Sequence, residues 1–466
     1  MLIIEALASI VCSAYGGKER YVLCLLCFRT SKKRVFGMLN IDLSKVIFIA
    51  GAIALTGCGG GGGGSSSTPV ASTPAASTPA ASTPSSSSDD FDLAGMLVDI
   101  ADKVMIPNYT ALSTATSALS ASSGVDSYCS AIGSAGEAAA QSAMKIVWQD
   151  AVTAMQKTES HAVGPIANND DTLRNRIHSY ANVDLGECSI DRAVVAQTDA
   201  NFDLSARSSN QRGLGAIEYL LFNTTLTTSC APQITETSSW DELSSTDKKT
   251  QRCTYASKLA SDVASAASSV LTSWQASGND YRATFVSEGN AGASLQALTD
   301  VIIVHMDKEA KDRKVGIPTG VKEECSSFSC ASLVEFPYTE TSSAAIKNNL
   351  QGFRSIFTAG DGKGLDDLIT ERGYADVTAS LLEKTDAALA NIDAATVSIF
   401  DQATAINDSA TETQCTNSYV SPDTQSTNYS ACALTGLMKR ITDVLKIEFV
   451  TVLEVNLPGS VQSDND

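Results

Sequence analysis

Apolar residues recur at helical intervals through most of the chain after residue 90, and this periodicity most constrains the fold. At 138–155 the sequence AAAQSAMKIVWQDAVTAM places large apolar residues three or four positions apart, and 255–274 repeats the pattern. A proline-free stretch rich in Ala, Leu and Ile at 376–405 is a third such segment. No run of alternating β-branched residues is bounded by hairpin turns, so strands are not predicted. The sequence predicts an all-α protein built from helical bundles.

The segments with helical periodicity fall into two regions, separated by a polar connection at 223–239. Residues 91–466 are numerous enough for two domains or for one large core. We expect two helical-bundle domains packed against each other, an N-terminal bundle at 91–235 and a C-terminal bundle at 236–466.

An export signal is predicted near the start of the chain. Residues 38–57 begin with a charged leader, continue with the apolar run 46–55 and end in small residues before Cys58. The apolar run is short for a transmembrane helix, which favours a secretory signal peptide. Its ending, Leu-Thr-Gly-Cys, resembles a bacterial lipobox, and this resemblance implies cleavage before Cys58 and attachment of lipid to its sulfur. A free cysteine at the end of a core helix is the alternative interpretation.

The sequence on either side of this signal is not predicted to fold. Residues 1–37 precede a complete signal, so we interpret them as a mis-called upstream extension, with an extended signal leader as the alternative. Residues 58–90 are rich in Gly, Ser, Thr and Pro and repeat the triplet Ser-Thr-Pro. Such a composition cannot bury apolar surface, so we expect a disordered tether that holds the folded part away from a membrane.

The chain that follows the signal is strongly acidic. The first 57 residues hold seven Lys/Arg and three Asp/Glu, so the remainder holds 26 basic and 49 acidic side chains, a net charge of −23. Binding to a nucleic-acid backbone needs clustered Lys and Arg. We therefore expect no nucleic-acid partner.

Eight cysteines follow Cys58, an even number that predicts disulfide bonds in an exported chain. They are Cys129, Cys188, Cys230, Cys253, Cys325, Cys330, Cys415 and Cys432. Short separations favour the pairs Cys325–Cys330, Cys415–Cys432 and Cys230–Cys253, which leaves Cys129–Cys188 as a longer link. None of these cysteines has a CxxC spacing, and the chain has only three histidines, so a zinc finger is not predicted.

Several segments resemble the imelysin-like family of exported bacterial proteins. They are VWQDAVTAMQKTESHAVGP at 147–165, NFDLSARSSNQRGLGAIEYLLF at 201–222, KEAKDRKVGIPTG at 308–320 and EFPYTETS at 335–342. The resemblance implies an all-helical fold of two bundle-like domains with a pocket where they meet. It also implies iron or haem acquisition, or another ligand-binding task in the cell envelope.

The family carries a signature, Gly-x-His-x-x-Glu, which resembles residues 213–218 of this chain. The matching residues are Gly213, Leu214, Gly215, Ala216, Ile217 and Glu218, so a glycine stands at the position of the histidine. A hydrolytic metal site needs three protein ligands and an open position for water, and the histidine is the best nitrogen donor of the signature. The chain also has no HExxH motif. Although the family takes its name from a proposed metallopeptidase, we expect this chain not to be an enzyme.

Five residues in the matching segments are candidates for a binding pocket: Glu218, Arg212, Glu159, Gly213 and Gly215. The two glycines would let a ligand or another backbone approach the start of the helix that carries Glu218. Arg212 could pair with Glu218 or hold an anionic ligand in a bidentate fork. The alternative is that Arg212, Glu159 and Glu218 form a buried ion-pair network that joins the bundles.

His305 and Glu309 are candidate metal ligands, because residues four apart on a helix share a face. The run 305–314 also contains the pairs Asp307–Lys311 and Lys308–Asp312, which are four apart as well. This pattern favours a solvated, salt-bridged helix face.

The other two histidines, His161 and His178, are isolated in the sequence. We interpret each as a surface histidine or as a hydrogen-bonded polar residue. No residue pattern requires a metal or a cofactor, and iron or haem enters only through the family resemblance.

Together these expectations describe a lipid-anchored protein exported to the bacterial cell envelope. By resemblance to Gram-negative lipoproteins, Gly59 rather than an aspartate after Cys58 indicates the outer membrane. The predicted function is binding of an iron or haem ligand in a pocket between two helical domains, with envelope transport proteins as partners. The alternatives are a divergent metallopeptidase-like hydrolase and a structural surface lipoprotein with a vestigial pocket.

Overall fold

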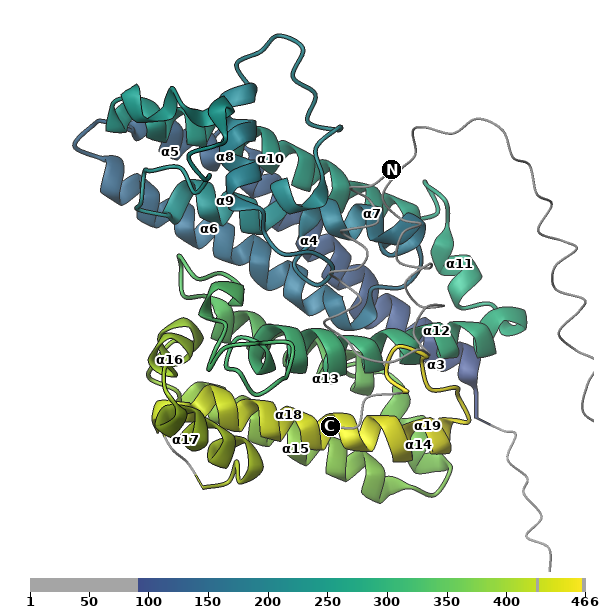
Figure 1. Cartoon of the computed structure of the whole chain (residues 1–466). Coiled ribbons are helices and arrows are strands. Elements are labelled where there is room, and N and C mark those ends of the chain that lie inside the picture. Colours follow the sequence, from purple (N-terminus) through teal and green to yellow (C-terminus); the bar gives the residue numbers. More distant parts are fainter. Residues whose placement is uncertain (1–90, 425–426, 463–466) are drawn as a thin grey trace, which may run out of the picture. The chain divides into compact units, whose positions relative to one another are not determined.

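The computed structural model describes residues 91–424 and 427–462, and within these ranges every regular element is a helix (Figure 1). The predicted all-α fold is therefore confirmed. In the same ranges no helix is both long enough and apolar enough to cross a membrane. The predicted extension, signal peptide, tether and lipidation residue Cys58 lie outside the described residues.

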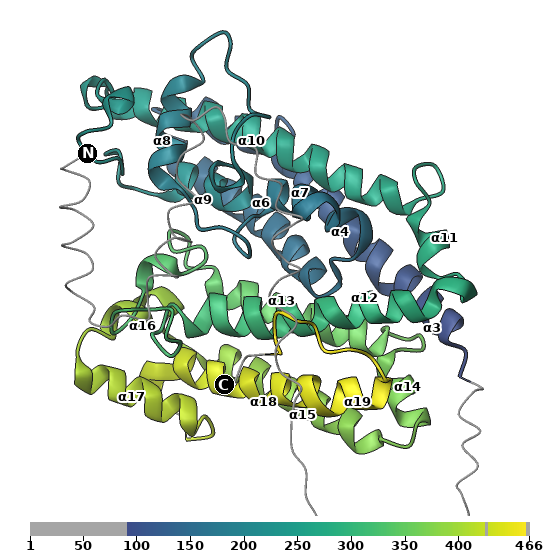
Figure 2. The ribbon, with the colours of Figure 1, turned by 45° about the vertical axis from the view of Figure 1, so that its right-hand side comes forward.

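The helices between residues 106 and 274 pack around one long helix, α10. They are α4 (Ile106–Ser120), α5 (Val125–Ala131), α6 (Glu137–Thr158), α7 (Asn168–Ile177), α8 (Glu187–Ala196), α9 (Gly213–Phe222) and α10 (Ser245–Trp274). Helix α10 contacts α4, α5, α7, α8 and α9, and α4 in turn packs against α6 (Figure 2). The apolar face predicted for α10 is buried, including Leu259, Val263 and Trp274. The helical periodicity of 255–274 is therefore confirmed.

The helices after residue 290 form a second group around α18. They are α12 (Ala291–Val304), α13 (Ser342–Thr358), α14 (Leu365–Glu371), α15 (Ala375–Ala394), α16 (Ile399–Ala405), α17 (Ser409–Val420), α18 (Ser430–Val444) and α19 (Val450–Leu453). Helix α18 contacts α15, α17 and the π-helical segment η10 (His305–Gly316), which continues α12. Two helices lie outside these groups in the sequence: α3 (Leu93–Ile100), which contacts α12, and α11 (Tyr281–Phe285), which follows α10.

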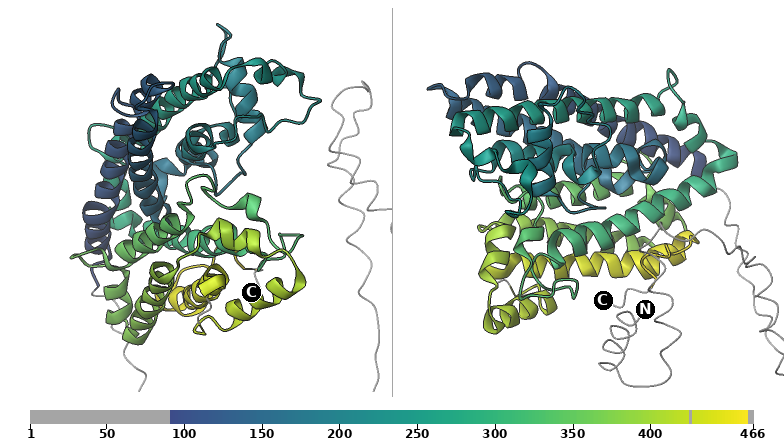
Figure 3. Two further views of the ribbon diagram at one scale, coloured as in Figure 1. Left: turned by 90° about the vertical axis from the view of Figure 1, so that its left-hand side faces the viewer. Right: turned by 45° about the horizontal axis from the view of Figure 1, so that its top comes forward.

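The two groups belong to one compact unit and meet along α6 and α13 (Figure 3). A Cβ atom at Gly352 of α13 would lie 2.6 Å from the carbonyl oxygen of Lys157, so only glycine lets the two backbones come this close. Across the same contact, Asn349 Nδ2 donates to the carbonyl oxygen of Gln156 at 2.8 Å. Helix α10 follows the predicted domain boundary at residue 235 in the sequence, yet it packs with the first group.

Four disulfide bonds link the eight cysteines of the described part. They join Cys129 to Cys253, Cys188 to Cys230, Cys325 to Cys330 and Cys415 to Cys432. The predicted pairs Cys325–Cys330 and Cys415–Cys432 are confirmed, whereas Cys230–Cys253 and Cys129–Cys188 are wrong. Because α5 packs against α10, the Cα atoms of Cys129 and Cys253 lie 5.6 Å apart across a sequence separation of 124. Helix packing rather than proximity in sequence decides these two pairs.

Candidate functional site

A cavity of about 330 Å³ lies at the start of α9. Its walls come mainly from α9, from the segment 178–188 that follows α7, and from the segment 332–338 that precedes α13. Three of the five predicted pocket residues are among those that line it: Arg212, Gly215 and Glu218. The other two are not lining residues: Gly213 and Glu159.

Helix α9 begins at Gly213, which lets it pack closely against the end of α7. Gly213 has a φ of +80°, in the left-handed region, and a Cβ atom there would lie 2.7 Å from the carbonyl oxygen of Ile177. Both the conformation and the lack of space therefore require glycine. Trp148 of α6 fixes the same turn, since its Nε1 donates to the carbonyl oxygen of Leu214 at 3.0 Å. The close backbone approach predicted for Gly213 is confirmed.

Glu218 lies further along α9 and is 1% exposed. Its Oε1 accepts hydrogen bonds from the backbone nitrogen of Thr339 at 2.8 Å and from Thr339 Oγ1 at 2.7 Å. Burial raises the pKa of Glu218 from its ordinary value of 4.5 to about 8; the charge of Glu335 adds to the rise, and the hydrogen bonds from Thr339 reduce it. The carboxyl group therefore holds a proton at neutral pH and can donate a hydrogen bond.

Arg212 pairs with Asp262 of α10 and not with Glu218. Its Nε and Nη2 atoms lie 3.0 and 2.6 Å from Asp262 Oδ2, while Arg176 contacts the other oxygen of the same carboxylate at 2.8 Å. The predicted pairing of Arg212 with Glu218 is wrong, because Asp262 takes the guanidinium. The alternative network of Arg212, Glu159 and Glu218 does not form either, since these side chains have separate partners.

His178 is buried in the wall of the cavity beside Gly215. A Cβ atom at Gly215 would lie 3.8 Å from Cε1 and 3.9 Å from Nδ1 of His178. The His178 ring stacks on Phe336 with centroids 5.0 Å apart and on Tyr180 with centroids 6.0 Å apart. His161 is buried as well, so neither is a surface histidine. Position 215, at which the resemblance to the family signature would place a histidine, therefore lies next to an imidazole from another segment.

Glu335 contacts the Nε2 atom of His178, at 2.8 Å from Glu335 Oε1. The same oxygen lies 3.1 Å from Lys314 Nζ and accepts a hydrogen bond from Gln156 Nε2 at 2.9 Å. Burial raises the pKa of Glu335, but the charge of Lys314 and the hydrogen bond with His178 outweigh burial and lower it to about 2. An ionised carboxylate thus lies near the protonated Glu218. Sequence reasoning missed this pair, because 157 residues separate Glu335 from His178.

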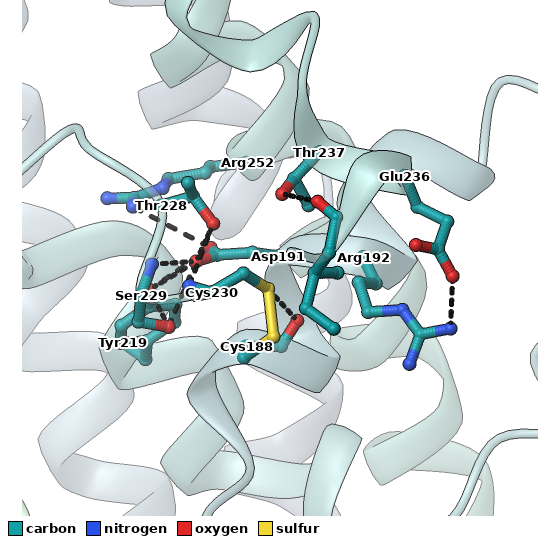
Figure 4. The surroundings of a disulfide bond; sticks show 11 residues. Cys188, Asp191, Arg192, Tyr219, Thr228, Ser229, Cys230, Glu236, Thr237 and Arg252 are labelled. Atoms are coloured by element: carbon teal, nitrogen blue, oxygen red, sulfur yellow. Dashed lines mark hydrogen bonds and ion pairs between the residues drawn. A yellow bond between two sulfur atoms is a disulfide. The ribbon is translucent and has the colours of Figure 1, made fainter. Parts of the chain in front are cut away.

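The disulfide bond Cys188–Cys230 stabilises one wall of the cavity by joining α8 to the loop after α9 (Figure 4). Beside it, Asp191 accepts hydrogen bonds from Tyr219 Oη at 3.0 Å and from the backbone nitrogen of Ser229 at 2.7 Å. Both Cys188 and Ser229 line the cavity. The disulfide bond and the hydrogen bonds to the buried Asp191 carboxylate therefore stabilise the same part of the cavity wall.

A second group of polar residues lies apart from the cavity lining: Glu159, Arg174, His305 and Glu309. Glu159 belongs to η4 (Glu159–His161), directly after α6, and the other acid and the histidine lie on η10. His305 Nδ1 lies 2.8 Å from Glu309 Oε2 and 3.9 Å from Glu159 Oε2. The two candidate metal ligands His305 and Glu309 therefore lie on one face of η10, as their spacing predicts, and Glu159, predicted for the pocket, lies beside them instead.

Most of the run 305–314 is buried, so the prediction of a solvated helix face is wrong. Its predicted ion pairs do form, with Lys311 Nζ 2.9 Å from Asp307 Oδ1 and Lys308 Nζ 3.6 Å from Asp312 Oδ2. Because η10 packs against α12, α13 and α18, the pair Lys311–Asp307 lies in the interior, 1% and 0% exposed. The charges that suggested a surface helix instead stabilise one another inside the protein.

Two solved structures have the same fold. An imelysin-like protein from Psychrobacter arcticum 273-4 aligns with a TM-score of 0.53 and 14% identity, over 79% of this chain and 97% of that protein. A protein of Parabacteroides distasonis ATCC 8503, named as a proposed iron-regulated protein A precursor, aligns with a TM-score of 0.50 and 13% identity, over 76% of this chain and 95% of its own. No protein with a curated description matches significantly. The family model described as Imelysin matches residues 105–422, more than half of the sequence, and the chain therefore belongs to the imelysin family.

Proposed function

We propose that this chain is a lipid-anchored protein of the bacterial cell envelope that binds a compact iron-bearing ligand in the cavity beside Glu218. The signal and lipobox at 38–58 support export and anchoring, with the outer membrane as the location. One structural neighbour is named for iron regulation, which supports the link to iron. In this role the chain would supply its ligand to transport proteins of the envelope.

The burial of the Glu218 carboxyl group in the cavity wall, which raises its pKa, is the observation that carries this proposal. Burying a carboxyl group is costly unless a cation or a set of hydrogen bonds compensates it. Within the described residues Glu218 accepts hydrogen bonds from Thr339 and forms no ion pair. An acid with a raised pKa that lines a cleft is a candidate for ligand contact. A protonated Glu218 would donate its hydrogen to an oxygen of the ligand.

The lining of the cavity indicates the class of ligand. Its volume lies at the lower end of the range of about 300–1,000 Å³ that small-molecule pockets occupy, which favours a compact ligand over haem. Carboxylates and a guanidinium both line it, including Asp184, Glu187 and Arg212. A metal ion chelated by a small organic acid carries both signs of charge, and iron prefers oxygen donors of this kind when it is oxidised. Ferric iron held by a hydroxy acid is therefore the ligand class that we propose.

We also propose that the cavity binds its ligand without hydrolysing it. A metallohydrolase needs three protein ligands and a free position for water. The described residues bring three His or carboxylate donors together at Glu159, His305 and Glu309, none of which lines the cavity. His178, the imidazole of the cavity, is engaged by Glu335 and stacked on two rings.

Equilibrium binding to the full chain tests the ligand. Ferric citrate, citrate alone and haem are titrated into the wild-type protein and into Glu218→Ala, with the exposed Glu412→Ala as a matched control. We expect saturable binding of ferric citrate to the wild type and to Glu412→Ala, and an affinity lower by about tenfold in Glu218→Ala, because alanine cannot donate the hydrogen bond that the protonated acid gives to the ligand. The absence of saturable binding to the wild type would contradict the proposal.

Membrane fractionation tests the anchor. Cys58→Ser should leave the membrane fraction and lose incorporation of labelled fatty acid, because the sulfur that carries the lipid is gone. Cys27→Ser, in the segment upstream of the predicted signal, is the control and should behave as the wild type. Retention of Cys58→Ser in the membrane with its label would refute lipidation at this residue.

A further inference from the structure

Glu159, His305 and Glu309 bring one imidazole and two carboxylates together in the interior, away from the cavity lining. One donor atom from each side chain lies within 4.8 Å of the other two. Glu159 is 2% exposed and His305 is 1% exposed, while the side chain of Glu309 is 12% exposed and forms the outer edge. This spacing is compatible with a single metal ion between them.

Two atoms of the group lack hydrogen-bond partners in the described structure: Glu159 Oε1 and His305 Nε2. A buried polar atom without a partner costs about 1–3 kcal/mol, so such atoms require an explanation. In Glu159, the oxygen Oε2 contacts Arg174, and the other oxygen, Oε1, has no hydrogen-bond partner in the described structure. A metal ion held by Glu159 Oε1 would take up the capacity of that oxygen, which no other described side chain does, while the contacts of His305 within the group are made through its Nδ1.

Arg174 of α7 now lies between the two carboxylates. Its Nη2 contacts Oε2 of both Glu159 and Glu309, and its Nη1 donates to Glu309 Oε1 at 3.0 Å. One guanidinium thus pairs with two carboxylates at once. A divalent ion in its place would neutralise both carboxylates, which is favourable in a desolvated site. The guanidinium therefore occupies the position that suits a divalent cation.

Arg174 has a third carboxylate to pair with, on the outer side. Its Nη1 lies 3.8 Å from Asp171 Oδ2, one turn earlier, and the Asp171 side chain is 27% exposed. Asn169, Asp170 and Asp171 all have positive φ, a left-handed conformation that Asn and Asp adopt more readily than most other non-glycine residues. A change of conformation in this segment would let Arg174 pair with Asp171 and leave the interior site.

We propose that Glu159, His305 and Glu309 bind a divalent first-row transition metal ion, and that Arg174 is an internal cation which this ion displaces. Imidazole and carboxylate together suit iron, manganese, cobalt and zinc better than calcium or magnesium. His305 and Glu309 lie on η10, which ends where the backbone nitrogen of Ile317 donates to the carbonyl oxygen of Asp312, five residues back, at 2.8 Å, and π-helical turns are frequent at functional sites. This site does not depend on the cavity beside Glu218.

Titration of the wild-type full chain with Co²⁺ and Mn²⁺ tests the site directly. We expect one bound ion per chain, with Co²⁺ giving visible absorption bands typical of nitrogen and oxygen ligation. Glu309→Gln, at the partly exposed edge, should weaken binding by about tenfold or more, because it removes a charged ligand. Glu218→Gln should bind Co²⁺ as the wild type does, which separates this site from the ligand cavity.

The Arg174→Ala variant tests the displacement. Without the guanidinium the ion meets no internal competitor, so Co²⁺ should bind about tenfold tighter or more, and it should raise the melting temperature that the substitution lowers. The second substitution His305→Ala should abolish this rescue. Arg354→Ala, which removes an exposed ion pair, is the control and should leave Co²⁺ binding unchanged.

Two results would overturn the proposal. If the wild type takes up no Co²⁺ or Mn²⁺, the group is an ion pair only, whatever the variants do. If the wild type binds an ion but Glu309→Gln and His305→Ala bind it equally well, the ion is held elsewhere on the surface. Should Arg174→Ala not fold, the wild-type titration and Glu309→Gln still decide between these outcomes.

Discussion

Replacement of Glu218 by glutamine should change how the stability of the protein depends on pH. Glutamine has nearly the shape of the protonated acid, and its Oε1 can still accept the two hydrogen bonds from Thr339. It cannot ionise. The wild type and Glu218→Gln therefore differ in one titrating group, which in the wild type is buried and has a pKa of about 8.

The sign of the effect follows from where the proton is held. Between pH 4.5 and about 8 the native protein keeps the proton of Glu218, whereas the unfolded chain, with its ordinary pKa of 4.5, has lost it. The native state then binds more protons, so its stability falls as pH rises through this window and becomes constant above it. A rise of about 3.5 pH units, at about 1.36 kcal/mol per unit, corresponds to about 5 kcal/mol.

Urea unfolding of both proteins at several pH values between 4 and 9, with the disulfides intact, measures this effect. Other groups titrate equally in the two proteins, so the difference between their free energies of unfolding isolates Glu218. Relative to the wild type, the free energy of unfolding of Glu218→Gln should rise by about 5 kcal/mol from pH 4 to pH 9. The control Glu412→Gln should show no such trend. A difference that stays constant with pH would refute a buried, protonated Glu218.

Three further predictions follow from the backbone, the cavity and the disulfides. Gly213→Ala should lower the free energy of unfolding by about 2 kcal/mol or more in urea, whereas Gly215→Ala should raise it by about 0.5–1 kcal/mol, since its new Cβ has room. Gly215→Leu should fold but lose ferric citrate binding in titrations, because its side chain enters the cavity. Replacing both Cys129 and Cys253 by serine should lower the free energy of unfolding by about 5 kcal/mol, as expected for a loop of this length; a loss near 2 kcal/mol would contradict the chain-entropy estimate.

The periodicity of the sequence was sufficient to predict several long helices and the buried face of α10. The face of α10 with Leu259, Val263 and Trp274 is buried as predicted, because a helix with an apolar stripe must bury it. The same local information predicted the link Cys325–Cys330, whose partners are five residues apart. A buried helix face and a disulfide between near neighbours both depend on residues that are close in the sequence, and therefore both can be predicted from it.

Contacts between distant helices could not be predicted in this way. Arg174 reaches Glu309 across 135 residues, and no local spacing marks either as a partner of the other. The charges of the run 305–314 suggested exposure, yet α12, α13 and α18 bury it. Paired charges have the same sequence pattern in water and in the interior, so only the packing distinguishes them.

The glycine at position 215 shows how such packing changes the meaning of a motif. By the family resemblance a histidine belongs there, and its loss seemed to remove the imidazole from the site. In the fold, Cε1 of His178 lies 3.8 Å from the place where a Cβ of residue 215 would be, and both His178 and Glu218 line the cavity. A histidine side chain at 215 would have to share that space with His178. The cavity therefore keeps an imidazole, supplied from the end of α7, and the small residue at 215 is what leaves room for it.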